Sequence, residues 1–157
     1  MQHLPISIQA RDGSGRFGAY LALPTSGRGP GLVIAQEIFG VNKTMRDIAD
    51  DYAEEGYVVL VPDLFWRQEP GIELGHSAED MQRAFGYYGG FDEAKGVEDL
   101  QSTLDALRAM PQFKGKAGVL GFCLGGKLAY LAAARTDRKS TRLNSSHHAI
   151  SRMPSSA

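Results

Sequence analysis

One short segment of the sequence has the residue types and spacing of a catalytic nucleophile. Cys123, the only cysteine in 157 residues, stands in Gly121-Phe122-Cys123-Leu124-Gly125-Gly126, after an apolar run and before a segment with helical periodicity. A nucleophile flanked by small residues two positions away on each side, at a strand–turn–helix junction, is typical of a nucleophile elbow, here with cysteine where serine is usual. The tight turn holds the nucleophile in a strained backbone conformation. It also brings the flanking positions so close to the neighbouring strand or helix that a side chain at Gly121 or Gly125 would collide with it.

An elbow would also activate this cysteine. At a helix N-terminus the dipole and the free N–H groups favour a thiolate, and the N–H of Leu124 would point toward a developing oxyanion. Two other interpretations compete with the elbow. A lone cysteine is often a small apolar residue packed between a strand and a helix. A dinucleotide-binding loop is disfavoured, because the glycines do not give G-x-G-x-x-G and no acidic residue ends a following strand.

A second candidate segment, Gln36-Glu37-Ile38-Phe39-Gly40, directly follows the apolar run 32–35. A carboxylate at the end of a buried strand is costly unless it has a partner, whereas a lone glutamate in a loop is usually solvated. The residues alone leave both interpretations of Glu37 open. In folds that carry a nucleophile elbow this loop supplies the second oxyanion donor, so the backbone N–H of Ile38 is a candidate.

The elements that must position these segments alternate between strand and helix. Two alternating runs around Asp12-Gly13 predict an N-terminal β-hairpin, and continuous apolar runs at 32–35, 57–61 and 116–121 predict buried strands. Helices are expected from Asn42 to about Gly56, after Asp92 and after the elbow, with at most a short helix near 79–85. This alternation predicts a parallel sheet covered on both faces, with the hairpin adding antiparallel strands at one edge.

Composition and charge exclude several classes of protein. The apolar share is 43%, the charged share 22% and the net charge −1, so nothing indicates a surface for nucleic acid or an anionic membrane. No apolar run approaches the roughly 20 residues of a membrane span, and the N-terminus lacks the pattern of a signal peptide. One cysteine forms no intramolecular disulfide and makes a cysteine-based metal cluster unexpected. We expect a cytoplasmic protein without nucleic-acid or membrane partners.

The composition changes after about Asp137. Residues 138–157 are polar, Ser-rich and aperiodic, which predicts disorder. They also resemble translated sequencing-adapter sequence of the kind that terminates misassembled reading frames. We therefore predict a partial domain over 1–137 and a disordered, non-native tail over 138–157.

Three segments together resemble the dienelactone hydrolase (carboxymethylenebutenolidase) family, over a stretch from about Ile6 to about Asp137. The resemblance implies an α/β-hydrolase fold, incomplete here, that contains the hairpin and the first βα units through the elbow. It also implies hydrolysis of an enol-lactone or carboxylic ester through an acyl-enzyme, by a Cys-His-Asp triad, without metal or organic cofactor. The substrate would be a small molecule and the intact protein a monomer. The segments are Ala35-Gln36-Glu37-Ile38-Phe39-Gly40-Val41-Asn42, Val61-Pro62-Asp63-Leu64 and Gly121-Phe122-Cys123-Leu124-Gly125-Gly126.

The resemblance also implies roles for single residues. Cys123 would be the nucleophile, and Glu37 would sit beside the resting thiol and help to generate the thiolate when substrate binds. Phe39 would contact the substrate. Arg83 is the nearest match to an arginine that holds the substrate carboxylate, but it is displaced by one position, and we favour a solvated helix charge.

The chain departs from the family after the elbow. In this fold the triad acid and histidine lie on loops after later strands, and these units are absent from the sequence. His3 and His76 are expected on the surface and His147 and His148 in the tail, so we predict that the chain as written is inactive or nearly so, with an unpaired sheet edge. Two alternatives remain: an acyltransferase with a cysteine elbow, disfavoured because polyester synthases lack the Gln-Glu-Ile-Phe-Gly loop, and a non-catalytic remnant that binds a small molecule or carries a redox-responsive thiol.

Overall fold

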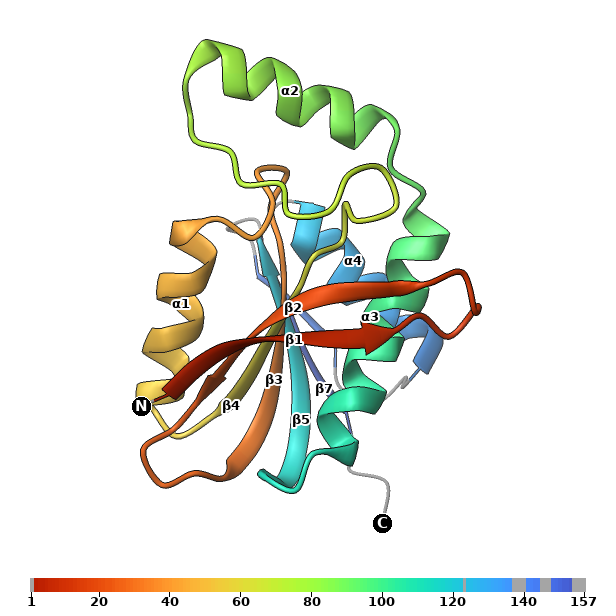
Figure 1. Cartoon of the computed structure of the whole chain (residues 1–157). Helices are drawn as coiled ribbons and strands as arrows, with labels where there is room; N and C mark the ends of the chain where they lie inside the picture. Colours follow the sequence, from red (N-terminus) through yellow and green to blue (C-terminus); the bar gives the residue numbers. More distant parts are fainter. Residues whose placement is uncertain (1, 123, 137–140, 145–147, 154–157) are drawn as a thin grey trace.

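The computed structural model describes residues 2–122, 124–136, 141–144 and 148–153, and within them the strands form one seven-stranded sheet in the order β1-β2-β4-β3-β5-β7-β6 (Figure 1). The strands are β1 (Gln2–Gln9), β2 (Arg16–Leu23), β3 (Gly29–Ala35), β4 (Val58–Pro62), β5 (Phe113–Phe122), β6 (Thr141–Asn144) and β7 (His148–Met153). The helices are α1 (Lys43–Glu54), α2 (Ala78–Gly89), α3 (Glu93–Ala109) and α4 (Leu124–Thr136).

The centre of the sheet is parallel, as the sequence predicts. β3 runs parallel to both β4 and β5, and the predicted hairpin of β1 and β2 adds antiparallel strands beside β4. The hairpin turn contains Gly13 at φ +78°, a conformation that glycine adopts without steric cost. The carboxyl ends of β3, β4 and β5 consequently lie at one edge of the sheet, where the candidate segments are found.

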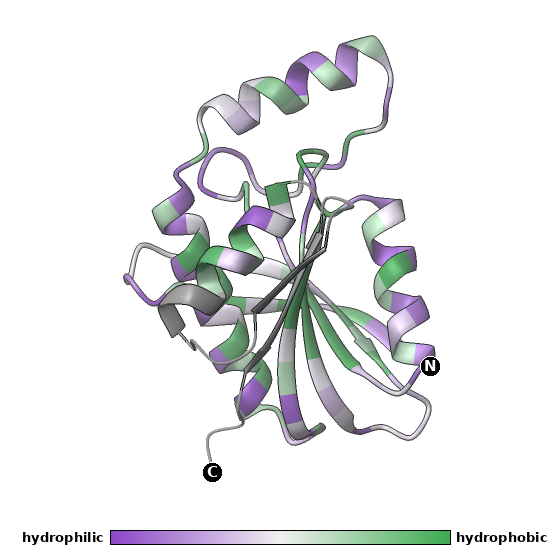
Figure 2. Cartoon of the chain, turned by 180° about the vertical axis from the view of Figure 1, so that it is seen from behind, coloured by the Kyte–Doolittle hydropathy of each residue, from purple (hydrophilic) through white to green (hydrophobic). Residues whose placement is uncertain are grey.

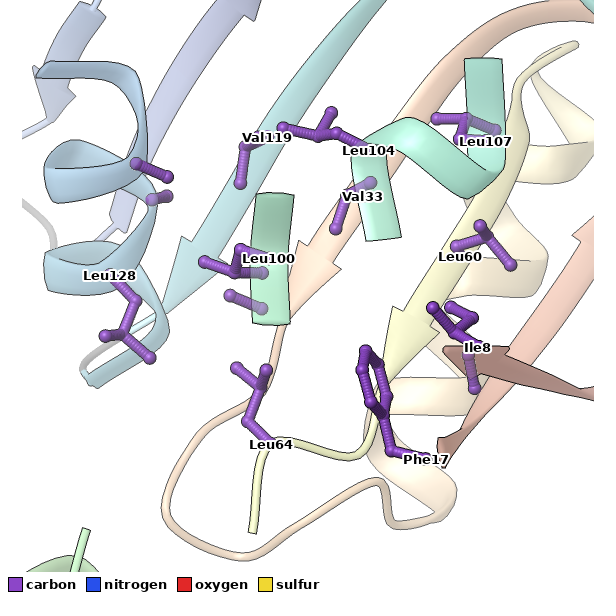
Figure 3. Close-up of a cluster of buried hydrophobic side chains, with 14 of the residues drawn as sticks. Ile8, Phe17, Val33, Leu60, Leu64, Leu100, Leu104, Leu107, Val119 and Leu128 are labelled. Carbon is purple, nitrogen blue, oxygen red and sulfur yellow. The ribbon is translucent and has the colours of Figure 1, made fainter. Parts of the chain in front are cut away.

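Helices bury hydrophobic side chains on both faces of the sheet, α1 on one face and α3 and α4 on the other (Figure 1). α3 buries one apolar face, formed by residues at helical spacing: Val97, Leu100, Leu104 and Leu107. The hydrophobic cluster under α3 and α4 is larger than the one under α1. Figure 3 shows part of this larger cluster, where leucines of α3 lie over Val33 of β3. Burying one such leucine stabilises the fold by about 1.5–3 kcal/mol. Seen from behind, the strands are largely hydrophobic, whereas polar and apolar residues alternate along α2 (Figure 2).

Side-chain caps set the starts of the helices. Asn42 and Asp92, the residues from which two helices are predicted to start, accept hydrogen bonds from backbone N–H groups three residues on, at 3.1 Å each. The sequence predicts at most a short helix near 79–85, and the structure corrects this, because α2 has 12 residues. Ser77 caps α2 by accepting from the Asp80 N–H at 3.1 Å, and the ring of Tyr87 in its last turns stacks on Phe65 at 5.8 Å.

A network of charged groups joins the hairpin turn to α3. The guanidinium of Arg67 donates to both carboxylate oxygens of Asp99, at 2.8 and 3.1 Å, and lies 4.6 Å from the centre of the Trp66 ring. The indole N–H of Trp66 donates to the same carboxylate at 2.9 Å. Asp12 of the turn pairs with Lys95 of α3 at 3.0 Å and with Arg67 at 3.2 Å. Hydrogen bonds from Ser14, and then from Lys95, hold the pKa of Asp12 well below its ordinary value.

The last two strands, β6 and β7, lie within residues 138–157. β7 pairs antiparallel with β5, and β6 pairs antiparallel with β7. The edge of β5, which would otherwise present unpaired N–H and C=O groups, gains a hydrogen-bonded neighbour. The predicted disorder and non-native origin of residues 138–157 both stay predictions, and His147 lies outside the described residues. None of the described helices has the length and apolarity that crossing a bilayer requires.

Candidate active site

The predicted elbow lies at the junction of β5 and α4. β5 ends at Phe122 and α4 begins at Leu124, so a single position separates strand from helix. Cys123 itself lies outside the described residues. A Cβ added at Gly121 would lie 2.0 Å from the Gly125 carbonyl oxygen, and one at Gly125 would lie 2.3 Å from the Ala35 carbonyl oxygen. The predicted steric requirement for glycine on both sides of position 123 is therefore confirmed.

The same contacts bring the two candidate segments together. Gly125, in the first turn of α4, approaches the carbonyl oxygens of both Ala35 and Gln36. In the sheet, Ala35 of β3 is the register partner of Gly121 of β5. Position 37 comes two residues after Ala35, and position 123 comes two residues after Gly121. Both positions therefore lie at the same edge of the sheet, where the adjacent parallel strands β3 and β5 end.

Hydrogen bonds hold the loop that carries Glu37 and Ile38. The side chain of Gln36 is fully buried: its Oε1 accepts from the Leu64 N–H at 2.8 Å, and its Nε2 donates to the Glu37 carbonyl at 3.1 Å. Gly40 ends the turn at φ +81°, where a Cβ would lie 2.1 Å from the Ile72 carbonyl oxygen. Since the loop is bound on several sides, it can present its backbone in one fixed orientation.

Glu37 and Ile38 are both half-buried. Within the described part of the chain no basic side chain forms an ion pair with Glu37. Phe39 is 8% exposed, and its ring packs against His76 with the ring centres 4.5 Å apart. His76 and His3 are exposed, which confirms their predicted surface location.

Arg83 is not brought to this loop by any described contact. It is exposed on α2, and a hydrogen bond with the Tyr87 hydroxyl, with further contributions from Glu69 and Asp80, raises its pKa above the ordinary arginine value. In Figure 1, α2 lies beyond the edge of the sheet at which β3, β4 and β5 end. Arg83 thus has the surroundings of a solvated helix charge.

Asp63, which belongs to the second of the three family-like segments, has a structural setting at the end of β4. The residue is 8% exposed, and its carboxylate accepts from the Phe65 and Gly71 N–H groups at 3.2 and 2.8 Å. Burial raises its pKa, and the two backbone hydrogen bonds partly oppose that shift. Asp63 also lines a cleft of about 270 Å³ together with Tyr20 and Arg46. Among the described residues, no group of three or more His, Cys, Asp or Glu side chains could hold a metal ion.

The sheet order, the one-residue junction between β5 and α4 and the loop facing it define an α/β-hydrolase. Solved structures agree with this class. A dienelactone hydrolase-like promiscuous phosphotriesterase from metagenomic libraries is similar at a TM-score of 0.65 and 27% identity, over 86% of this chain and 55% of that one. The dienelactone hydrolase of Anabaena variabilis, at 20% identity and a TM-score of 0.61 over 87% of this chain and 59% of that one, supports the fold alone.

Sequence comparison narrows the class to one family. The model of the dienelactone hydrolase family matches residues 17–143, and the chain belongs to that family. The carboxymethylenebutenolidase of Pseudomonas sp. strain P51 is 47% identical over 82% of this chain and 54% of the relative. Carboxymethylenebutenolidase 1 of Cupriavidus pinatubonensis is 42% identical over 83% and 56%, respectively. The chain therefore spans about half the length of the curated relatives it matches.

Proposed function

We propose that this chain is the nucleophile-bearing part of a hydrolase that cleaves an enol-lactone or another carboxylic ester through an acyl-enzyme on Cys123. The observation that carries the proposal is the close approach of Gly125 to the Ala35 and Gln36 carbonyls, which puts the start of α4 against the loop of Glu37 and Ile38. Relatives named carboxymethylenebutenolidase support the choice of a lactone or ester.

In the acylation step, the Glu37 carboxylate accepts the proton of the Cys123 thiol, and the sulfur forms a bond to the ester carbonyl carbon. The carbonyl π electrons move to the oxygen, where the N–H groups of Leu124 and Ile38 donate to the resulting oxyanion. The intermediate collapses as the carbon–oxygen bond to the leaving group breaks. The departing enolate or alkoxide takes the proton that Glu37 holds.

In the second step, water adds to the thioester carbonyl, the carbon–sulfur bond breaks, and a proton returns to the sulfur. The family resemblance assigns the activation of that water to a histidine held by an aspartate, on loops after later strands. The two steps therefore use different proton acceptors, Glu37 in acylation and that histidine in deacylation.

Two further residues are assigned to substrate binding. Phe39 is a candidate for substrate contact because it belongs to the oxyanion loop, although its ring is buried against His76. Arg83 stays the weaker candidate for binding a substrate carboxylate, given its exposed place on α2. A cytoplasmic location, a monomeric state and the lack of nucleic-acid partners remain predictions from the sequence.

The test is acylation of the purified chain by p-nitrophenyl acetate, followed by nitrophenolate release and by intact-protein and peptide mass spectrometry. We expect one acetyl group per chain, on Cys123, and no acetylation at this position in Cys123→Ala. Transfer of the acetyl group to an added alcohol but never to water would indicate an acyltransferase. Labelling of Cys123 by a thiol reagent without any acetylation would contradict the proposal and favour a binding or redox role.

A further inference from the structure

We propose that Gln36 is a positioning residue that aims the Ile38 N–H at the oxyanion. This inference rests on the proposed function. The side chain of Gln36 is fully buried, and a buried amide is costly unless its polar atoms are hydrogen-bonded. Both ends of this amide are used: Oε1 accepts from the Leu64 N–H at 2.8 Å, and Nε2 donates to the Glu37 carbonyl at 3.1 Å.

The second of these bonds controls the candidate oxyanion donor through the peptide plane. The carbonyl of Glu37 and the N–H of Ile38 belong to one planar trans peptide and point in opposite directions. Holding the carbonyl therefore fixes the direction of the N–H. The Gly40 N–H also donates to this carbonyl, but at 3.4 Å. No described residue accepts a hydrogen bond from the Ile38 N–H, which leaves that group available for a substrate oxygen.

The first bond fixes the amide itself. Leu64 lies two residues beyond β4, so Gln36 spans from the end of β3 to the end of its neighbouring strand. A flipped amide would place a donor against the Leu64 N–H and an acceptor against the Glu37 carbonyl, so only the observed orientation satisfies both partners. The orientation of the Glu37–Ile38 peptide is thereby tied to the rigid centre of the sheet.

The test compares two reactions of Cys123, of which only one passes through an oxyanion. Acylation by p-nitrophenyl acetate forms the oxyanion, whereas alkylation by iodoacetamide displaces iodide from a saturated carbon and forms none. In Gln36→Glu the acceptor for Leu64 is kept, while a carboxylate oxygen replaces the donor to Glu37. We expect acylation to slow by about 10-fold or more, since losing an oxyanion donor outright costs about 100- to 1,000-fold, and alkylation to change less than about twofold.

Two further variants make the test independent of folding. Gln36→Met keeps the side-chain volume but lacks both polar ends, and it should show the same selective loss. Gln68→Ala removes a matched side-chain bond to a backbone carbonyl, from Gln68 Nε2 to Tyr87 at 2.8 Å on the surface, and should change neither rate. Circular dichroism checks that each variant is folded.

The pH dependence gives a readout that a purely structural role would not move. A buried carboxyl protonates more readily than an exposed one, and a protonated Glu at position 36 regains a donor for the Glu37 carbonyl. The ratio of acylation to alkylation in Gln36→Glu should therefore rise as the pH falls, and in Gln36→Met it should not. An equal loss of both rates, or an unchanged acylation rate, would overturn the inference. Absence of acylation in the unsubstituted chain would instead overturn the proposed function and this inference with it.

Discussion

The contact of Gly125 with the end of β3 leads to a quantitative prediction for Gly125→Ala. The added Cβ would lie 2.3 Å from the Ala35 carbonyl oxygen and 2.6 Å from the Gln36 carbonyl oxygen. Both obstacles are backbone atoms at the end of a central strand, so no rotamer change relieves them. The first turn of α4 must retreat by about 1 Å to reach an ordinary contact distance.

Two opposing contributions set the size of the effect. Overpacking of a well-packed interior costs about 1–3 kcal/mol, and more where the backbone must move. Alanine in a helix is favoured over glycine by about 1 kcal/mol. Because the obstacles at Gly125 belong to the backbone, we expect Gly125→Ala to lower the free energy of unfolding by about 2 kcal/mol. Gly86 in α2 is a matched control, since a Cβ there meets nothing within 4 Å, and Gly86→Ala should raise stability by about 0.5–1 kcal/mol.

Urea unfolding followed by the fluorescence of Trp66, the only tryptophan in the sequence, measures both variants. The midpoint should fall for Gly125→Ala and rise for Gly86→Ala, with unchanged slopes. The reasoning is refuted if Gly125→Ala is as stable as the unsubstituted chain, or if both substitutions shift the midpoint in the same direction. In the first case α4 would not be pressed against β3, and the geometric support for an elbow would fail with it.

Two further predictions concern buried carboxylates. Asp99→Ala should lower the free energy of unfolding by about 2–3 kcal/mol, because it leaves the Trp66 N–H and the partly buried guanidinium of Arg67 without their shared acceptor. As a control, Asp105→Ala, at an exposed position on the same helix, should change this free energy by less than about 0.5 kcal/mol in the same urea titration. Burial raises the pKa of Asp63, so its favourable contribution is present below its ordinary pKa of 3.8 and is lost as the pH rises through the raised value. Unfolding measured from about pH 4 to about pH 7 should therefore show a decline relative to Asp63→Asn, and parallel curves for the two proteins would contradict this assignment.

Local patterns in the sequence predict most of the sheet and its helices. Alternation of apolar runs with helical periodicity gives the parallel centre, and Asn42 and Asp92 mark two helix starts correctly. The length of α2 escapes prediction because part of its support is the stacking of Tyr87 on Phe65, a contact between segments 22 residues apart. The pairing of β7 with β5 also joins segments that are far apart in the chain. The sequence of β7 has no strand periodicity of its own, so local patterns do not predict this pairing.

In the candidate site, too, local sequence predicts some features, whereas others depend on contacts between distant segments. The elbow glycines follow from a steric rule about six consecutive residues. The buried setting of Gln36 could not be predicted from neighbouring residues, because its partner Leu64 is 28 residues away. A glutamine after a strand looks like an ordinary loop residue. The exposed setting of Arg83 depends on where α2 lies relative to the sheet. The predicted approach of the Cys123 sulfur to the Glu37 carboxylate stays a prediction, since Cys123 lies outside the described residues.

The charged network that joins the hairpin turn to α3 has a consequence for the order of folding. Asp12 and Lys95 are 83 residues apart in the chain. During synthesis the hairpin leaves the ribosome long before the helix that anchors it, and contacts of such long sequence separation form slowly. Until α3 begins to form, the hairpin turn lacks its ion pair with Lys95, and of the charged partners of Asp12 only Arg67 has been synthesised. Nascent chains that stall before residue 95 would expose this hairpin to proteases and to chaperones.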